Sequence, residues 1–117
     1  MLRRGGNLDH VHLLGRKTVE FMTSDQLGPE VDIEALRNFA NLNGYGFGLG
    51  VAVRRSAGVA GIVGSPGDYN WGGAGGTYFW VDPKEELTVV LMECASVQAR
   101  GRMRQLITTL VYASLEN

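Results

Sequence analysis

The chain has little of the chemistry that cysteine and lysine provide. Its 117 residues include one cysteine, Cys94, and two lysines, Lys17 and Lys84. A single cysteine excludes a disulfide within the chain. Because Cys94 ends an apolar run, we expect a small buried side chain rather than a reactive thiol. The formal net charge of −1 provides no overall attraction to nucleic acid or to an anionic membrane, so neither is expected as a partner.

Long apolar segments are also missing. No apolar run approaches the ~20 residues that a membrane-spanning helix needs, and the opening MLRRGGNLDH lacks the apolar core of a signal peptide. We therefore expect a cytoplasmic location for the chain as given. Hydrophobic residues make up 44% and charged residues 20% of the sequence, which is typical of one folded globular domain with a modest core.

Several motifs of enzyme and nucleotide sites are absent. The chain contains neither G-x-G-x-x-G nor a Gly-Lys pair, which excludes the dinucleotide and triphosphate loops that these motifs define. It contains neither G-x-S-x-G nor a serine followed three residues later by lysine, two common settings of an activated serine. These patterns predict no complete nucleophilic site and no cofactor.

The histidines and the clustered arginines give no strong sign of a binding site. His10 and His12 could share one side of a strand, but two ligands from one strand do not make a metal site, so we expect no metal. Arg100 and Arg104 share a helical face near Arg102. A solvated face is favoured over a nucleic-acid interface, because nucleic-acid-binding modules normally carry a basic net balance.

Hydrophobic periodicity divides the chain into three parts of a single partial domain. Residues 1–43 form a helical and loop lead-in, with a short helix expected over about 16–23 and one or two helical turns between 29 and 43. Residues 44–94 are predicted to form antiparallel strands. Residues 96–115 are predicted to form a covering helix.

Four stretches carry strand signals. GYGFGLGVAVRR, from residue 44, alternates glycine with large apolar residues, and its final Arg54 and Arg55 are expected to meet water. GVAGIVG at 58–64 is a second β-like stretch, and GSPGDYN supplies turn residues. A third strand is expected over about 75–81. The fourth, LTVVLMEC at 87–94, is apolar enough for a strand buried on both faces.

The last segment predicts a long amphipathic helix over about 97–115, about 28 Å long. Its apolar residues recur at spacings of three and four, namely Met103, Leu106, Ile107, Leu110, Val111 and Leu115. Strands joined by short links must be antiparallel. The sequence therefore predicts an α+β fold, an antiparallel β-sheet covered by a long C-terminal helix.

The stretch YNWGGAGGTYFWVDP places four glycines within five positions before strong strand formers. Glycine at this density weakens a strand, and a common reason for it is that another group must approach the backbone closely. That group could be a ligand. The alternative is a glycine bulge, or a packing contact under a helix.

GYGFGLGVAV, WGGAGGTYFWVDP, LTVVLM and a terminal helix together resemble the C-terminal portion of serine hydrolases related to class C β-lactamases. The similarity is greatest to the family VIII carboxylesterases, and it implies the C-terminal part of the β-lactamase/transpeptidase-like fold. Trp71-Gly72-Gly73 resembles the family's third motif, which is Lys-Thr-Gly, His-x-Gly or Trp-x-Gly. The resemblance implies that Trp71 lines the substrate pocket, that Gly73 lets an acyl group lie against the strand, and that the Ala74 N–H is an oxyanion-hole donor.

The family's other two motifs, Ser-x-x-Lys and Tyr-x-Asn, are absent. The chain thus has no catalytic residue of its own, and we expect it to be inactive alone. A small ester or lactam would be its substrate only in a full-length context. Tryptophan in place of lysine favours an ester, because the cation that would pair with a carboxylate is missing.

Two other functions remain open. The chain could be a non-catalytic module that self-associates through exposed sheet edges, with a homodimer as the expected form. It could instead supply its glycine-rich strand to a separate chain that carries the nucleophile.

Overall fold

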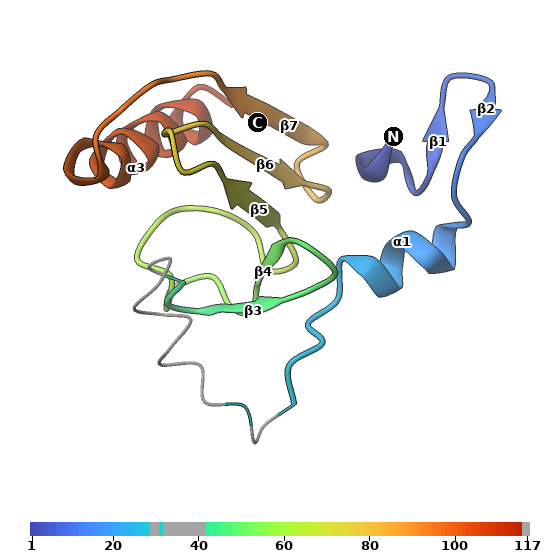
Figure 1. Ribbon diagram of the computed structural model, residues 1–117. Coiled ribbons are helices and arrows are strands. Elements are labelled where there is room, and N and C mark those ends of the chain that lie inside the picture. Colours follow the sequence, from blue (N-terminus) through green and yellow to red (C-terminus); the bar gives the residue numbers. More distant parts are fainter. Residues whose placement is uncertain (29–30, 32–41, 116–117) are drawn as a thin grey trace.

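The computed structural model describes residues 1–28, 31 and 42–115, and its centre is a five-stranded sheet (Figure 1). The strand order is β3-β4-β5-β6-β7, and every neighbouring pair is antiparallel. A long helix, α3 (Val97–Ala113), lies along one face. The predicted α+β class is confirmed. The strands are β3 (Tyr45–Phe47), β4 (Ala52–Arg54), β5 (Tyr69–Gly72), β6 (Tyr78–Asp82) and β7 (Leu87–Leu91).

The N-terminal elements lie beside the sheet, at the right of Figure 1. They are η1 (Leu2–Arg4), β1 (Asn7–Leu8), β2 (Val11–His12) and α1 (Arg16–Met22). The helix predicted over about 16–23 is therefore present. The helical turns predicted between 29 and 43 fall almost entirely outside the described residues.

A carboxylate joins the segment after α1 to the sheet. Asp25 accepts hydrogen bonds from the Phe47 N–H at 3.1 Å and from Arg55 Nε at 2.6 Å. Its carboxylate lies against Gly46, where any Cβ would collide with it. The glycine of β3 is thus explained by a close approach, and the approaching group belongs to the chain itself.

Two of the strand predictions are wrong in detail. The stretch from Gly44 to Arg54 is a hairpin rather than one strand, because the Gly48 N–H bonds the Val51 carbonyl at 2.8 Å and reverses the chain. The stretch 58–64 forms turns instead of a strand. Its carbonyls turn inward and bind Arg54, which is only 3% exposed and does not meet water as expected.

The glycine-rich stretch also differs from its prediction. Tyr69 and Asn70, expected in a turn, begin β5, and the third strand begins at Tyr78 rather than near Gly75. Most of the glycines therefore lie in the connection between two strands. We call β5, β6 and this connection, residues 73–77, the glycine hairpin.

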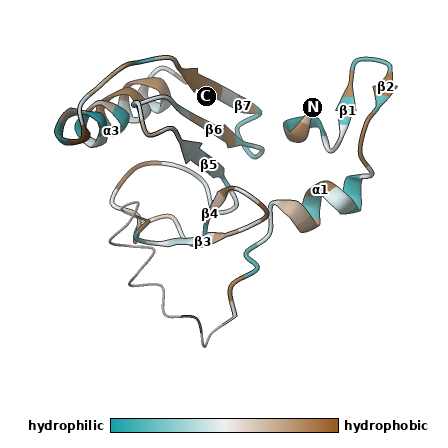
Figure 2. Ribbon diagram, viewed as in Figure 1, coloured by the Kyte–Doolittle hydropathy of each residue, from teal (hydrophilic) through white to brown (hydrophobic). Residues whose placement is uncertain are grey.

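The fourth strand was expected to be buried on both faces, and this is wrong. β7 is the edge of the sheet, and its side chains alternate between half-buried and exposed, with Val90 63% exposed. It stands out as a brown apolar edge in Figure 2. Cys94 just beyond it is also exposed, contrary to expectation. An apolar strand at an unpaired edge is a surface suited to pairing.

Helix α3 contacts the sheet through a different face from the predicted one. Its N-cap is Ser96, whose side chain accepts from the Ala99 N–H at 3.3 Å. The predicted apolar stripe is largely exposed, with Leu110 64% exposed, whereas Thr108 is buried. The stacked Trp80 and Tyr112 rings explain this orientation, since they place the polar and aromatic side of the helix inward. None of the described helices is long and apolar enough to span a membrane.

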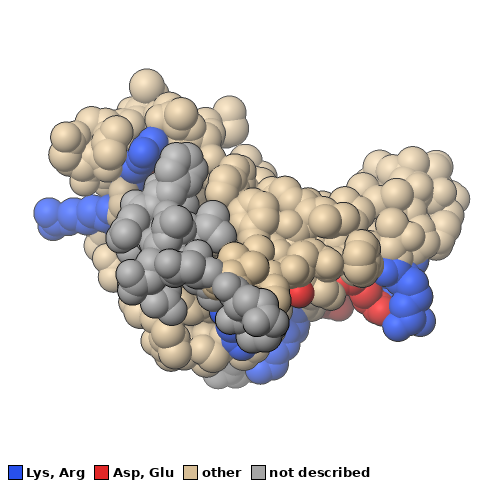
Figure 3. Space-filling model, turned by 60° about the horizontal axis from the view of Figure 1, so that its bottom comes forward, with Lys and Arg blue, Asp and Glu red and all other residues tan. Residues whose placement is uncertain are grey.

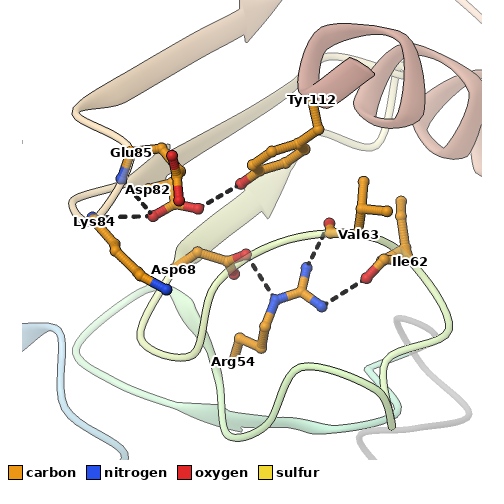
Figure 4. Close-up of polar contacts among 8 residues, drawn as sticks. All are labelled: Arg54, Ile62, Val63, Asp68, Asp82, Lys84, Glu85 and Tyr112. Atoms are coloured by element: carbon orange, nitrogen blue, oxygen red, sulfur yellow. Dashed lines mark hydrogen bonds and ion pairs between the residues drawn. The ribbon is translucent and has the colours of Figure 1, made fainter. Parts of the chain in front are cut away.

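Charged groups occupy the core beneath α3 (Figure 4). Arg54 Nε lies 2.7 Å from Asp68 Oδ2, and both side chains are 3% exposed or less. The remaining Arg54 nitrogens donate to the carbonyls of Ile62 and Val63. Burial raises the pKa of Asp68 to about 6, although the Arg54 charge opposes this shift. A buried charge pair needs such additional partners to be tolerated.

A second buried carboxylate, Asp82 at the end of β6, holds the C-terminal part of α3. Tyr112 donates a hydrogen bond of 2.7 Å to Asp82 Oδ2, and the N–H groups of Lys84 and Glu85 donate to Oδ1. Burial alone would raise the pKa of Asp82, but these hydrogen bonds outweigh it and hold the pKa below its usual value. The ionised carboxylate is therefore part of the folded structure.

Y112F is expected to lower the free energy of unfolding by about 1–3 kcal/mol, because a buried carboxylate loses a charge-assisted hydrogen bond. The stabilisation by Asp82 is present above its unfolded pKa and is lost as the pH falls through the lower folded value. Removing the Tyr112 donor raises that folded pKa, so the variant should lose stability at a higher pH on acidification. Urea unfolding curves at several pH values measure both effects.

S114A is the matched control for this experiment. Ser114 lies at the same end of α3, and its exposed hydroxyl donates only to the Val111 carbonyl. The control should change stability by less than about 0.5 kcal/mol. Equal stability of Y112F and S114A at every pH would show that the Asp82 contact does not hold the helix.

Candidate functional site

The four residues singled out from the sequence, Trp71 to Ala74, lie together where β5 ends. Gly72 pairs with Tyr78 across the hairpin. The Gly73 N–H then bonds the Thr77 carbonyl at 2.8 Å, and the Gly76 N–H bonds the Gly73 carbonyl at 3.1 Å. These two bonds close a tight connection whose outer residues are Ala74 and Gly75.

The close neighbours of these glycines are groups of the chain itself. A Cβ on Gly72 would collide with the Arg104 guanidinium, and one on Gly73 would collide with the Thr77 hydroxyl. Gly76 has φ +118°, and a Cβ there would lie 2.8 Å from the Ala95 backbone nitrogen. Packing against other parts of the chain therefore accounts for these three glycines. The predicted contact between Gly73 and a substrate remains a prediction.

The arginines of α3 bind the hairpin, so the prediction of a solvated face is wrong for Arg100 and Arg104. Arg100 Nη1 donates to the Ala74 carbonyl at 2.7 Å, and Arg104 Nη2 donates to the Thr77 carbonyl at 3.2 Å. The Arg104 guanidinium also lies 4.7 Å from the centre of the Tyr78 ring, a cation–π contact. Burial lowers the pKa of Arg104. The spacing of four residues between Arg100 and Arg104 was the sequence feature that could have indicated this contact, because residues four apart lie on the same face of a helix.

Among Trp71, Gly72, Gly73 and Ala74, only Ala74 is exposed. Within the described part of the chain its N–H donates no hydrogen bond, whereas Arg100 fixes its carbonyl. Trp71 is half-buried and packs edge-to-face on Phe47, with 5.1 Å between ring centres. The hairpin thus presents an N–H donor at Ala74 that has no partner among the described residues.

A hollow of about 180 Å³ adjoins the hairpin on the side of α3. Sequence reasoning did not identify its polar wall, which includes Tyr45, Asn70, Tyr78 and Arg104. No group of three or more metal-binding side chains occurs among the described residues. Figure 3 shows acidic atoms beside basic ones at the centre and right of the face that it presents, and two separate groups of basic atoms at the left with no acidic atoms near them.

The family of the chain follows from comparison with known proteins. The β-lactamase family model matches residues 1–107. The chain belongs to the β-lactamase family. No curated protein matches it in sequence. The resemblance of the glycine hairpin and the terminal helix to this family is therefore confirmed.

Solved structures of simvastatin synthase (LovD) from Aspergillus terreus share the fold. The LovD9 mutant is 21% identical with a TM-score of 0.71, covering 96% of this chain and 31% of that one. The LovD6 mutant is 20% identical with a TM-score of 0.72, covering 96% and 30%. The unliganded enzyme is 20% identical with a TM-score of 0.66, covering 97% and 32%. The chain thus spans about a third of the length of these structures.

G76A is expected to lower the free energy of unfolding by about 1–3 kcal/mol, because alanine is strained at this positive φ and would press on the backbone near Ala95. G75A is the matched control, since a Cβ on Gly75 meets nothing within 4 Å. It should be neutral or slightly stabilising. Denaturant unfolding of the two variants checks this, and equal losses would contradict the packing of the hairpin described above.

Proposed function

We propose that the chain is the C-terminal part of a β-lactamase-family serine hydrolase of the carboxylesterase type. In this proposal Trp71, Gly72, Gly73 and Ala74 edge the substrate cleft, and the Ala74 N–H is one of two oxyanion-hole donors. The observation that carries it is the exposed Ala74, whose carbonyl is held by Arg100 while its N–H has no partner among the described residues.

The proposed role has a simple physical basis. A donor fixed before the reaction stabilises the developing negative charge without having to reorganise. The Gly76 N–H bonds the Gly73 carbonyl, which belongs to the same peptide group as the Ala74 N–H, and Arg100 restrains the next peptide through the Ala74 carbonyl, so the Ala74 N–H is pre-oriented. Trp71 itself brings no cation for a substrate carboxylate, which favours an ester over a lactam, although Arg104 lines the nearby hollow.

One donor without a nucleophile or a base supplies little of the chemistry. The chain therefore contributes to catalysis only together with the first two family motifs, either in a longer chain or on a separate one. The test is reconstitution with the N-terminal part of a β-lactamase-family esterase, truncated before its own third motif.

In the reconstituted complex, A74P is expected to slow acylation of the nucleophilic serine by an activated short-chain ester about 10²–10³-fold, because it removes the proposed donor. A74G, which keeps the N–H, should retain most of the rate. The acyl-enzyme is measured by intact mass, and this chain alone should give no burst. Equal rates for A74P and A74G would contradict the oxyanion role, as would stoichiometric acylation of this chain alone.

A second candidate function, self-association, is favoured by the edge strand. β7 has no charged residue or proline over Leu87–Leu91, and Val90 and Met92 beside its free edge are 63% and 80% exposed. Such an edge can pair with the same strand of a second copy. The proposed form is a homodimer that extends the sheet across β7.

V90K should weaken this dimer at least tenfold, because lysine beside an edge strand opposes pairing. Q98K adds the same charge at an exposed position of α3 away from β7 and should leave the dimer intact. Light scattering measures the native mass across a dilution series. A wild-type chain that stays at the 12.7 kDa of one copy at high concentration would rule the dimer out.

A further inference from the structure

A small polar cavity lies between the sheet and α3. About 10 Å³ of it is open to the centre of a water-sized sphere. Asp68 before β5, Trp80 in β6 and Thr108 in α3 all line it. Each of these residues is at most 4% exposed. The cavity therefore adjoins three separate elements at the point where the helix meets the sheet.

One polar atom on each of these residues has no partner. Asp68 Oδ1, Trp80 Nε1 and Thr108 Oγ1 are buried and make no hydrogen bond to any described residue. Leaving a buried polar atom unpaired costs about 1–3 kcal/mol, and native proteins seldom leave three around one space. Because all three residues line the same cavity, a single molecule in it is the simplest shared partner for these atoms.

We propose that this cavity binds one water molecule, which bridges Asp68, Trp80 and Thr108. The donor and acceptor types match. The water donates to Asp68 Oδ1 and accepts from Trp80 Nε1–H, and it makes a third hydrogen bond with the Thr108 hydroxyl, which can act as donor or acceptor. Three bonds are the usual number for a buried water, and the cavity has room for one.

A metal cation fits the site less well than water does. Asp68 is already paired with Arg54 at 2.7 Å, so a further positive charge would lie close to a buried guanidinium. The indole N–H of Trp80 can only donate and cannot coordinate a cation. A neutral molecule that both donates and accepts satisfies all three groups.

The bound water links α3 to the ion pair in the core. Thr108 has no other described partner, so the water is its connection to Asp68 and, through Asp68, to Arg54. This contact lies between the Arg104 and Tyr112 contacts along the helix. It gives the inward face of α3 a third polar attachment to the sheet.

A high-resolution crystal structure tests the proposal directly, and density for one water within about 3.2 Å of the three atoms is expected. T108V keeps the shape of the side chain and removes one bond, so it should raise the unfolding equilibrium constant about tenfold. T109V is the matched control. Thr109 is exposed, and its hydroxyl donates to the Gln105 carbonyl. Removing this hydroxyl in T109V should change the unfolding equilibrium constant less than twofold.

Three results would overturn the proposal. One is an empty cavity, or one filled by a side chain, in a structure that shows other buried waters. The other is an equal change in the unfolding constant for T108V and T109V. In solution, the Trp80 indole proton should show a long-lived water contact by NMR, with the half-buried Trp71 as internal comparison; no such contact at Trp80 would also count against it.

Discussion

The attachment of α3 to the glycine hairpin is the contact on which the rest of the structure depends. Arg100 and Arg104 reach from the helix to the carbonyls of Ala74 and Thr77. Gly72 is free of a side chain where the Arg104 guanidinium crosses it. These contacts hold the connection between β5 and β6, in which the Ala74 N–H donates to none of the described residues. The candidate site is thus a consequence of how the helix packs.

This attachment explains why the helix exposes its apolar side. The inward face carries Arg104, Thr108 and Tyr112, which meet the aromatic side chains of β6 and the buried carboxylates. The outward face exposes Leu106 and Leu110, at 47% and 64%. Together with the open edge of β7, these side chains form apolar surface that a stable soluble domain normally covers. The chain spans about a third of the length of its structural relatives.

The sequence predicted the order of the helices and strands better than the burial and partners of their side chains. The helix over 97–113 and the antiparallel β-sheet follow from periodicity and short links, which are local properties of the chain. The hairpin at Gly48 was missed, because period-two alternation continues through a turn when every second residue is glycine. The solvated roles expected for Arg54 and Arg100 were wrong, since the partners of a long cationic side chain depend on tertiary contacts. The motif singled out Trp71 to Ala74, whose role in a site stays a prediction, whereas the contact of Arg100 with Ala74 required the structure.

Native-state hydrogen exchange of the hairpin amides is the most direct test of the central claim, that α3 holds the hairpin with the Ala74 N–H free. The N–H groups of Gly73 and Gly76 make hydrogen bonds within the hairpin, and that of Ala74 makes none to the described residues. We expect slow exchange at Gly73 and Gly76 and fast exchange at Ala74 in the same sample. Protection of Ala74 as strong as that of Gly73, or fast exchange at all three, would contradict it.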